Sequence, residues 1–164
     1  MAAPHQPLGR RQRRSRGSVL IVYLDTSALV KRYVREDGSD RVVEVCSQEN
    51  AFNLVSSELV VAEMASSLAR RQREGLLGAE MLRAVWRAFI GDSTRQYRLH
   101  SVDRDVLTEG RRLLLAHSLR TLDALHLATA GRIRRFAGDD CLFLTSDGRQ
   151  EAAARAEGWT TERV

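Results

Sequence analysis

Cysteine, lysine and aromatic residues are scarce in this sequence of 164 residues, and each scarcity narrows the possible functions. The two cysteines, Cys46 and Cys141, are far apart and form no CxxC pair. Isolated cysteines are typical of a reducing cytosol and argue against a cysteine-ligated metal site. Aromatic residues make up 5% of the chain, so stacking on nucleic-acid bases cannot be widespread. Lys31 is the single lysine, and we attribute the predominance of arginine mainly to genomic composition bias.

Long hydrophobic runs are also absent, and no stretch approaches the length of a transmembrane helix. An arginine-rich start followed by an apolar run could be taken for a secretory or twin-arginine signal. However, Asp25 interrupts that run after six residues, and no small-x-small cleavage site follows. We therefore expect a cytoplasmic protein that has no membrane partner.

The excess of positive charge is concentrated at the N-terminus. The formal net charge is +5, and residues 1–18 contain five arginines and no acidic residue. The remainder therefore carries no net charge, and the overall composition, 43% hydrophobic and 29% charged, is typical of a globular protein. We expect residues 1–18 to be a disordered basic extension, or the product of an over-extended start codon, and residues 19–164 to be one domain. Binding of RNA or DNA by the extension is the more specific alternative.

One segment organises the rest of the chain: the apolar run at residues 19–24 and the carboxylate that follows it, Asp25. A continuous apolar run rich in β-branched residues predicts a strand buried on both faces of a parallel sheet. Asp25 then lies at the carboxyl end of that strand, where ligands bind in open α/β sheets. We expect a helix at residues 28–33 to follow, with Thr26 or Ser27 as its cap.

Strands and helices are expected to alternate along the rest of the chain. Apolar or alternating segments predict strands, and amphipathic segments with capping residues predict helices. Four further strands are expected at residues 51–55, 96–102, 141–146 and 159–164. Helices are expected at residues 39–47, 57–73, 78–90, 103–117, 121–130 and 151–157. This alternation predicts an α/β fold with a mainly parallel central sheet.

Three more carboxylates stand out by their positions, and each has an ordinary structural alternative. Glu63 lies within the apolar stripe of its predicted helix, where an ionised carboxylate is costly unless it is paired, for example with an arginine at the helix edge. Asp123 is a polar exception in a nearly apolar helix, or simply a first-turn acid. Asp147 follows an apolar strand, or forms an Asx turn. His126, the other exception in the apolar helix, is best explained as a hydrogen-bonded core histidine.

Together the four carboxylates predict a metal site. Asp25, Glu63, Asp123 and Asp147 would meet at the edge of a parallel sheet where strands end and the following helices begin. Four acids in one place repel each other, and a hard divalent cation relieves that repulsion. Oxygen ligands without histidine or cysteine favour Mg²⁺ or Mn²⁺ over zinc. One or two such ions suit the attack of water on a phosphodiester.

Four segments resemble the acidic motifs of the PIN domain family, and most closely those of the VapC toxins of prokaryotic toxin–antitoxin pairs. They are Tyr23-Leu24-Asp25-Thr26-Ser27-Ala28-Leu29, the segment from Ser57 to Glu63, the segment from Thr121 to Ala128, and Leu144-Thr145-Ser146-Asp147. The resemblance covers about residues 19–164 and implies a PIN domain there, folded as a three-layer α/β/α sandwich. It also implies a Mg²⁺-dependent endoribonuclease that forms a homodimer and is neutralised by a cognate VapB-type antitoxin.

The resemblance also implies roles for individual residues. Asp25 and Asp123 would be the primary metal ligands, and Glu63 and Asp147 would complete the acidic cluster and help to position the attacking water. Thr145 or Ser146 would orient Asp25 by a hydrogen bond. The arginines nearest to the motifs, which would contact RNA phosphates, are Arg32, Arg70, Arg71 and Arg120.

Two other functions stay open at this stage. The first is a catalytically inactive PIN-like module that binds RNA or acts as a scaffold, although loss of activity would usually have removed one of the four acids. The second is a phosphohydrolase with an aspartyl nucleophile. It is disfavoured because Ser27 stands where a second aspartate is expected and no lysine lies near the last motif. Metal-dependent cleavage of RNA, but not of small phosphate esters, would separate these functions.

Overall fold

One parallel sheet forms the centre of the molecule. The structure is a computed structural model that describes residues 20–47, 52–138 and 140–164. The expected extension at residues 1–18 lies outside the described residues, as do residues 19 and 51 at the starts of two expected strands. The strand order is β3-β2-β1-β4-β5, and all neighbours are parallel. The strands are β1 (Ile21–Leu24), β2 (Asn53–Ser57), β3 (Arg98–His100), β4 (Cys141–Thr145) and β5 (Thr160–Arg163).

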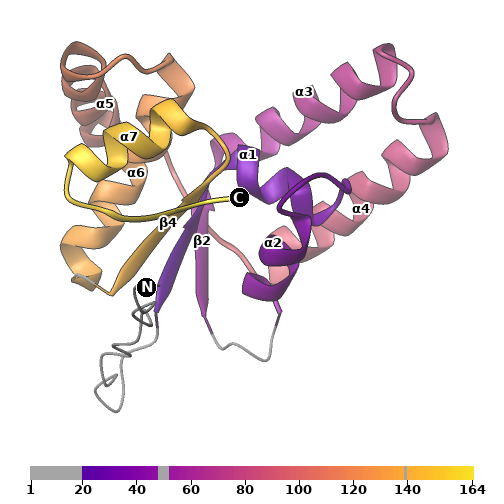
Figure 1. The fold of residues 1–164 in the computed structure, drawn as a ribbon, viewed down its shortest axis with the longest axis horizontal. Coiled ribbons are helices and arrows are strands. Elements are labelled where there is room, and N and C mark those ends of the chain that lie inside the picture. The colour runs from indigo at the N-terminus through magenta and orange to yellow at the C-terminus, as the bar shows by residue number, and fades with distance from the viewer. Residues whose placement is uncertain (1–19, 48–51, 139) are drawn as a thin grey trace, which may run out of the picture.

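Helices cover both faces of this sheet, which confirms the predicted three-layer α/β/α sandwich (Figure 1). One face carries α1 (Thr26–Leu29), the 3-10 turn η1 (Val30–Arg32), α2 (Ser39–Val45), α3 (Leu59–Arg73) and α4 (Ala79–Arg95). The other face carries α5 (Arg104–Ala116), α6 (Thr121–Ala137) and α7 (Gly148–Ala156).

The central strand, β1, is buried on both faces, as its apolar run predicts. Val22 and Leu24 pack into the core on the α1–α4 side, whereas Tyr23 packs into the core on the α5–α7 side. Each of the three side chains is at most 1% exposed. Because successive side chains of a strand point to opposite faces, the uninterrupted run serves two separate cores.

Two helices extend beyond their predicted ends. We expected one helix to end at Gly91, but α4 continues for another turn to Arg95. In that turn the hydroxyls of Ser93 and Thr94 donate to the carbonyls of Ile90 and Gly91. α6 likewise runs well past its expected end at residue 130. No helix in the described part of the chain is long and apolar enough to cross a membrane.

α3 and α4 form an antiparallel pair that projects from the rest of the molecule as an arm (Figure 1). α3 ends at Arg73, and the chain turns away at Gly75, whose φ of 72° is readily adopted only by glycine. Leu76, at the turn between the two helices, is 74% exposed. The arm therefore forms one wall of any cleft that opens beside α3.

Candidate functional site

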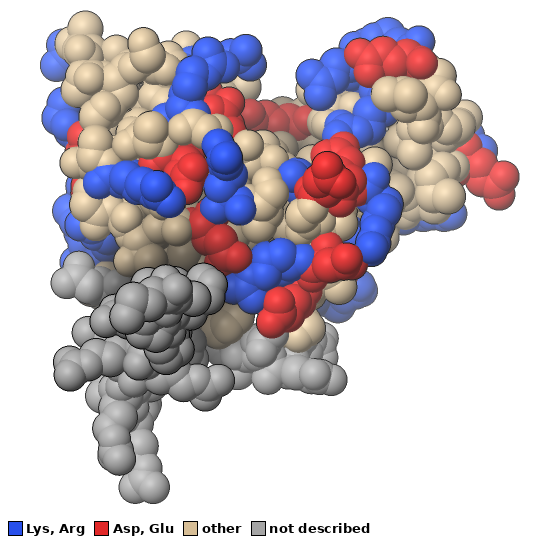
Figure 2. Space-filling model, in the orientation of Figure 1, with Lys and Arg blue, Asp and Glu red and all other residues tan. Residues whose placement is uncertain are grey.

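The four carboxylates singled out in the sequence line one open cleft of about 750 Å³. Asp25 and Asp147 reach it from the carboxyl ends of β1 and β4, Glu63 from α3, and Asp123 from the first turn of α6. Figure 2 shows the molecule hollowed at the top of the view, between the arm and the α5–α7 side, with acidic side chains at the bottom of the hollow. The fold thus brings together four segments that are far apart in the sequence.

Asp25 is almost fully buried and is held by hydrogen bonds to both of its oxygens. It is itself the N-cap of α1, a position that we expected for Thr26 or Ser27. Its Oδ2 accepts from the backbone N–H of Ser27 at 3.0 Å and from the Ser27 hydroxyl at 2.6 Å. Its Oδ1 accepts from the side-chain amide of Gln150 at 3.1 Å. Ser27 and Gln150 therefore fix this carboxylate, and no sequence pattern pointed to the role of Gln150.

Thr145 acts on Asp25 mainly through Gln150. The Thr145 hydroxyl lies 3.4 Å from Asp25 Oδ2, but it lies only 2.7 Å from Gln150 Oε1. A hydroxyl has a single proton, and the shorter contact is to an atom that can only accept. Ser146, the other residue expected to orient Asp25, instead donates its hydroxyl to the carbonyl of Val164.

Glu63 is fixed by Thr26, which lines the cleft, and by His126, which is fully buried. Its Oε2 accepts from the Thr26 hydroxyl at 2.6 Å and lies 2.5 Å from Nε2 of His126. Because a carboxylate can only accept, Nε2 carries the proton of this contact. The other ring nitrogen, Nδ1, lies 2.9 Å from the Tyr23 hydroxyl. The partner of Glu63 is thus a buried histidine and not the arginine that was the simpler expectation.

His126 is both a core histidine and part of this site. Its side chain is fully buried and hydrogen-bonded, as expected. Burial by itself lowers the pKa of His126, but the negative charges of Asp25 and Glu63 outweigh that effect and raise the pKa above its usual value. Burial, together with the same two carboxylates, raises the pKa of Tyr23 well above its usual value, so its hydroxyl stays neutral.

Asp123 and Asp147 are capping residues that also face the cleft. Asp123 Oδ2 accepts from the backbone N–H of Arg120 at 3.3 Å, at the start of α6. Asp147 is the N-cap of α7, and its Oδ1 accepts from the backbone N–H groups of Arg149 and Gln150 at 2.7 and 3.2 Å. The ordinary structural alternatives for both residues are therefore correct, and they coexist with a position in the cleft.

The four carboxylates of the cleft have few positive partners, the nearest being His126, which lies within ion-pairing reach of Asp25 and Glu63. Burial, together with the charges of Asp25 and Asp147, raises the pKa of Asp123. The one arginine within ion-pairing reach of the four carboxylates, among the described residues, is Arg149, at 3.8 Å from Asp147. A positive ligand in the cleft would relieve this repulsion.

Each carboxylate keeps one oxygen with spare acceptor capacity. Local hydrogen bonds occupy Oδ2 of Asp25, Oε2 of Glu63, Oδ2 of Asp123 and Oδ1 of Asp147. Of the opposite oxygens, Asp25 Oδ1 accepts the single bond from Gln150, and the other three accept no hydrogen bond from the residues that the structure describes. Hydrogen bonds thus orient each carboxylate and still leave one of its oxygens able to bind a cation.

This donor set fits a hard divalent cation. All four groups offer carboxylate oxygen, which Mg²⁺ and Mn²⁺ prefer. As the side chains stand, no three His, Cys, Asp or Glu residues in the described ranges are close enough together to enclose an ion. Mg²⁺ usually keeps several waters and binds through one or two carboxylates, so it would not require all four groups as direct ligands.

The arginines that were expected to contact RNA fall into two groups. Arg70, Arg71 and Arg120 line the cleft. Arg71 is tied to Glu36 by an ion pair, whereas Arg70 and Arg120 form no ion pair with any described residue. Arg32 does not reach the cleft. It is turned into the interior, where it donates to Gln96 and Tyr97 and pairs with Asp92, so this expectation was wrong.

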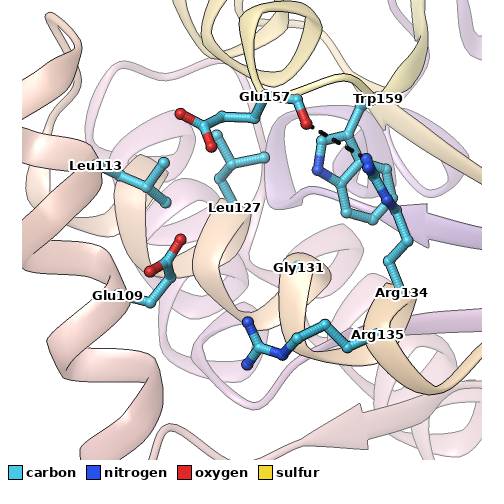
Figure 3. Close-up of a pocket in the computed structure, with 8 residues that line it drawn as sticks. All are labelled: Glu109, Leu113, Leu127, Gly131, Arg134, Arg135, Glu157 and Trp159. Atoms are coloured by element: carbon cyan, nitrogen blue, oxygen red, sulfur yellow. Dashed lines mark hydrogen bonds between the residues drawn. The ribbon is translucent and has the colours of Figure 1, made fainter.

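A second, smaller cavity of about 190 Å³ lies between α5, α6 and the segment after α7 (Figure 3). Most of its polar groups are already paired. Glu157 binds Arg112 and His117, and hydrogen bonding to Arg112 in particular lowers the pKa of Glu157. Arg134 stacks on Trp159 and donates to the carbonyl of Gly158. This small cavity is therefore bounded mainly by side chains that already pair with one another, and the acidic cleft is the better candidate site.

Comparison with known proteins identifies the family. Residues 22–156 match the PIN domain family. Over 137 residues, 84% of this chain and 92% of its relative, the sequence is 36% identical to Ribonuclease VapC46 from Mycobacterium tuberculosis.

Solved structures share the fold at low sequence identity. FitAcB from Neisseria gonorrhoeae superposes with a TM-score of 0.60 and 14% identity, covering 87% of this chain and 96% of that one. VapC20 from Mycobacterium tuberculosis, described as a sarcin-ricin loop cleaving toxin, superposes with a TM-score of 0.60 and 20% identity, covering 87% and 99%. VapBC2 from Rickettsia felis, bound to a DNA fragment from its promoter, superposes with a TM-score of 0.58 and 14% identity, covering 88% of this chain and 98% of that one. The chain therefore belongs to the PIN domain family and, within it, is related to the VapC proteins.

Proposed function

We propose that this chain is a VapC-type toxin, a Mg²⁺-dependent endoribonuclease in which Mn²⁺ can substitute. The observation that carries the proposal is the convergence of Asp25, Glu63, Asp123 and Asp147 on one cleft with little compensating positive charge. The 36% identity to Ribonuclease VapC46 supports RNA as the substrate. The reaction is hydrolysis of a phosphodiester bond within the RNA chain.

In this proposal each carboxylate has a role. Asp25 and Asp123 are the primary ligands of the cation, and Glu63 and Asp147 complete the acidic cluster and help to position the attacking water. When bound, the cation lowers the pKa of water and offsets negative charge on the reacting phosphate. Thr26 and His126 keep the Glu63 carboxylate in place through their bonds to its Oε2.

RNA binding is assigned to the arginines that remain available in the cleft. Arg70 on the α3 side and Arg120 at the start of α6 are exposed and line the same cleft as the acids. Guanidinium groups bind phosphate with two parallel hydrogen bonds, which suits a flexible single strand. Arg71 contributes less, because Glu36 already occupies its guanidinium.

The proposal includes the setting in which the enzyme works. A cognate VapB-type antitoxin neutralises it, the toxin is a homodimer, and both act in the cytoplasm, where the RNA is. Likeness to VapC46 and to VapBC2 supports the antitoxin. The alternative is a catalytically inactive PIN-like RNA-binding or scaffold module, and the presence of all four acids in one cleft argues against it.

Growth of a bacterial host after induction of the chain tests the proposal. We expect arrest with the unmodified chain and normal growth with Asp25→Asn, which removes a primary ligand but keeps the size of the side chain. The purified protein should cleave RNA in the presence of Mg²⁺, and cleavage should stop when EDTA is added. Cleavage by Asp25→Asn at the unmodified rate, or cleavage that persists in EDTA, would contradict the proposal.

A further inference from the structure

Gln150 is a buried polar residue in the first turn of α7. Its side chain has no exposed surface. It is polar, whereas two of its neighbours on the buried face of the helix, Ala153 and Ala154, are small and apolar. A buried amide costs free energy unless its hydrogen bonds are satisfied. The contacts that satisfy Gln150 therefore explain why an amide can stand at this position.

Three contacts define the orientation of the Gln150 amide. Its Nε2 donates to Asp25 Oδ1 at 3.1 Å and to the backbone carbonyl of Asp123 at 3.2 Å. Its Oε1 accepts from the Thr145 hydroxyl at 2.7 Å. Both Nε2 contacts are to atoms that can only accept, so the amide cannot be reversed without losing them. Gln150 thus joins the ends of β1 and β4 to the first turn of α6.

As a consequence, the two oxygens of the Asp25 carboxylate accept different numbers of hydrogen bonds. Oδ2 receives two donors from Ser27 and is filled. Oδ1 receives the single bond from Gln150 and keeps one acceptor position. The Gln150 bond thus holds the carboxylate in one rotamer and leaves Oδ1 as the oxygen that is available to a cation.

We infer that Gln150 is a positioning residue that fixes the orientation of Asp25 and its distance from Asp123. This inference rests on the proposed function, because it assigns to Asp25 and Asp123 a shared cation. Residues that orient a metal ligand from behind typically change metal affinity or activity by about 10–100-fold when they are mutated. Gln150 touches the ligand and not the substrate, so it is not a catalytic residue.

The test compares Gln150→Met with Glu151→Met. Methionine is unbranched and close to glutamine in length but has no N–H to donate. Glu151 is the next residue of α7 and is also largely buried, but its ion pairs are with Arg155 and Arg163 and not with the acids of the cleft. The Glu151 variant therefore controls for general loosening of the helix.

Two measurements are made on each full-length protein. In metal-free protein, NMR three-bond couplings report whether the Asp25 side chain keeps one rotamer. Titration with Mn²⁺, followed by electron paramagnetic resonance, reports cation affinity. We expect Gln150→Met to average the Asp25 rotamers and to weaken Mn²⁺ binding by about 10–100-fold. Glu151→Met should lower the melting temperature but leave both readouts as in the unmodified chain.

The outcomes separate this inference from the proposed function. Failure of the unmodified chain to bind Mn²⁺ would refute the proposed metal centre. Normal Mn²⁺ binding by Gln150→Met, or an unchanged Asp25 rotamer in it, would refute the role of Gln150 alone. If Gln150→Met does not fold, Gln150→Asn replaces it, because its amide is retained but is one methylene too short for all three contacts. The same loss of rotamer order is then expected, and its absence overturns the inference.

Discussion

At the scale of single residues, the carboxylates of the cleft do two things at once. Asp25, Asp123 and Asp147 each use one oxygen to cap or brace the start of a helix, and each presents the other oxygen to the same cleft. The local role fixes the side chain, and the shared position concentrates negative charge. The two roles have opposite effects on stability, so a substitution at these positions tests both.

Asp123→Asn separates the two effects when it is compared with Asp105→Asn. Both aspartates lie in the first turn of a helix, and both substitutions lose a favourable interaction with the helix dipole. Asp123→Asn also removes repulsion from Asp25 and Asp147. In metal-free protein we expect it to be the more stable of the two variants, with a melting temperature higher by about 1–3 °C. Only Asp123→Asn should lose RNA cleavage.

Scanning calorimetry of both variants in EDTA gives the comparison. Equal melting temperatures would mean that the charges in the cleft do not repel each other appreciably. Full cleavage activity in Asp123→Asn would remove this residue from the site.

Sequence patterns revealed which residues were unusual but not which residues they contact. Glu63 and His126 both interrupt apolar helix faces, yet they are 63 residues apart and nothing local indicates that they pair. Gln150 was not singled out at all, since one glutamine at the start of a predicted helix is ordinary. Contacts of this kind depend on side-chain directions that only the assembled sheet determines.

At the scale of the elements, η1 and the end of α4 are joined by a cluster of hydrogen bonds and an ion pair around Arg32. Arg32 donates to Gln96 and Tyr97, pairs with Asp92, and lies over the ring of Tyr33. These contacts hold the base of the α3–α4 arm against the first helical segment. They explain why an arginine near the first motif does not take part in the cleft.

Arg32→Met should therefore damage stability and not RNA binding. Loss of a partly buried arginine leaves Asp92 and Gln96 without their partner, and we expect a cost of about 2 kcal/mol in the free energy of unfolding. The control is Arg35→Met, whose pair with Asp40 is exposed, and here we expect a loss below about 0.5 kcal/mol.

Urea denaturation gives the two free energies, and RNA cleavage is measured at a temperature where both variants are folded. Both should cleave RNA at the unmodified rate. A variant Arg32→Met that is stable but inactive would return Arg32 to the list of RNA contacts.

Element boundaries show where local reasoning succeeds and where it fails. The cap at Asp103 was anticipated, and its carboxylate accepts from the backbone N–H of Val106. The cap at Asp25 was not anticipated, because Thr26 and Ser27 are also good capping residues. Which of the three residues caps α1 depends on the direction in which β1 ends. α4 passes through Gly91 despite the weak helix propensity of glycine, because its apolar face, which includes the fully buried Phe89, packs into the core.

At the scale of the whole molecule, the cleft lies on the seam between two separately packed layers. Glu63 comes from the α1–α4 layer, Asp123 from the α5–α7 layer, and Asp25 from the strand between them. The fold class followed from the apolar run of β1 and from the alternation of strands and helices. The strand order did not, because β1 pairs with β4, whose partner residues lie 120 positions away in the sequence.

A cation bound in this cleft would cross-link the two layers. Ligands that bind only the folded state stabilise it by about 2.7 kcal/mol when present at 100 times their dissociation constant. We therefore expect the melting temperature to rise as Mg²⁺ or Mn²⁺ is added and to return on addition of EDTA. Asp25→Asn should show little or no rise, and NaCl at equal ionic strength controls for screening by salt. A rise of equal size in Asp25→Asn would place the bound cation elsewhere.

The wide separation of the cleft residues along the chain also sets when activity can begin. A ribosome that makes this protein completes Asp25, Glu63 and Asp123 well before it adds Asp147 and Gln150. Until then β1 has no β4 beside it, and the amide that braces Asp25 does not exist. The cleft is therefore assembled only after β4 and the first turn of α7 have been added. A chain that stops before β4 lacks both Asp147 and Gln150, so under the proposed function it would have no complete metal site.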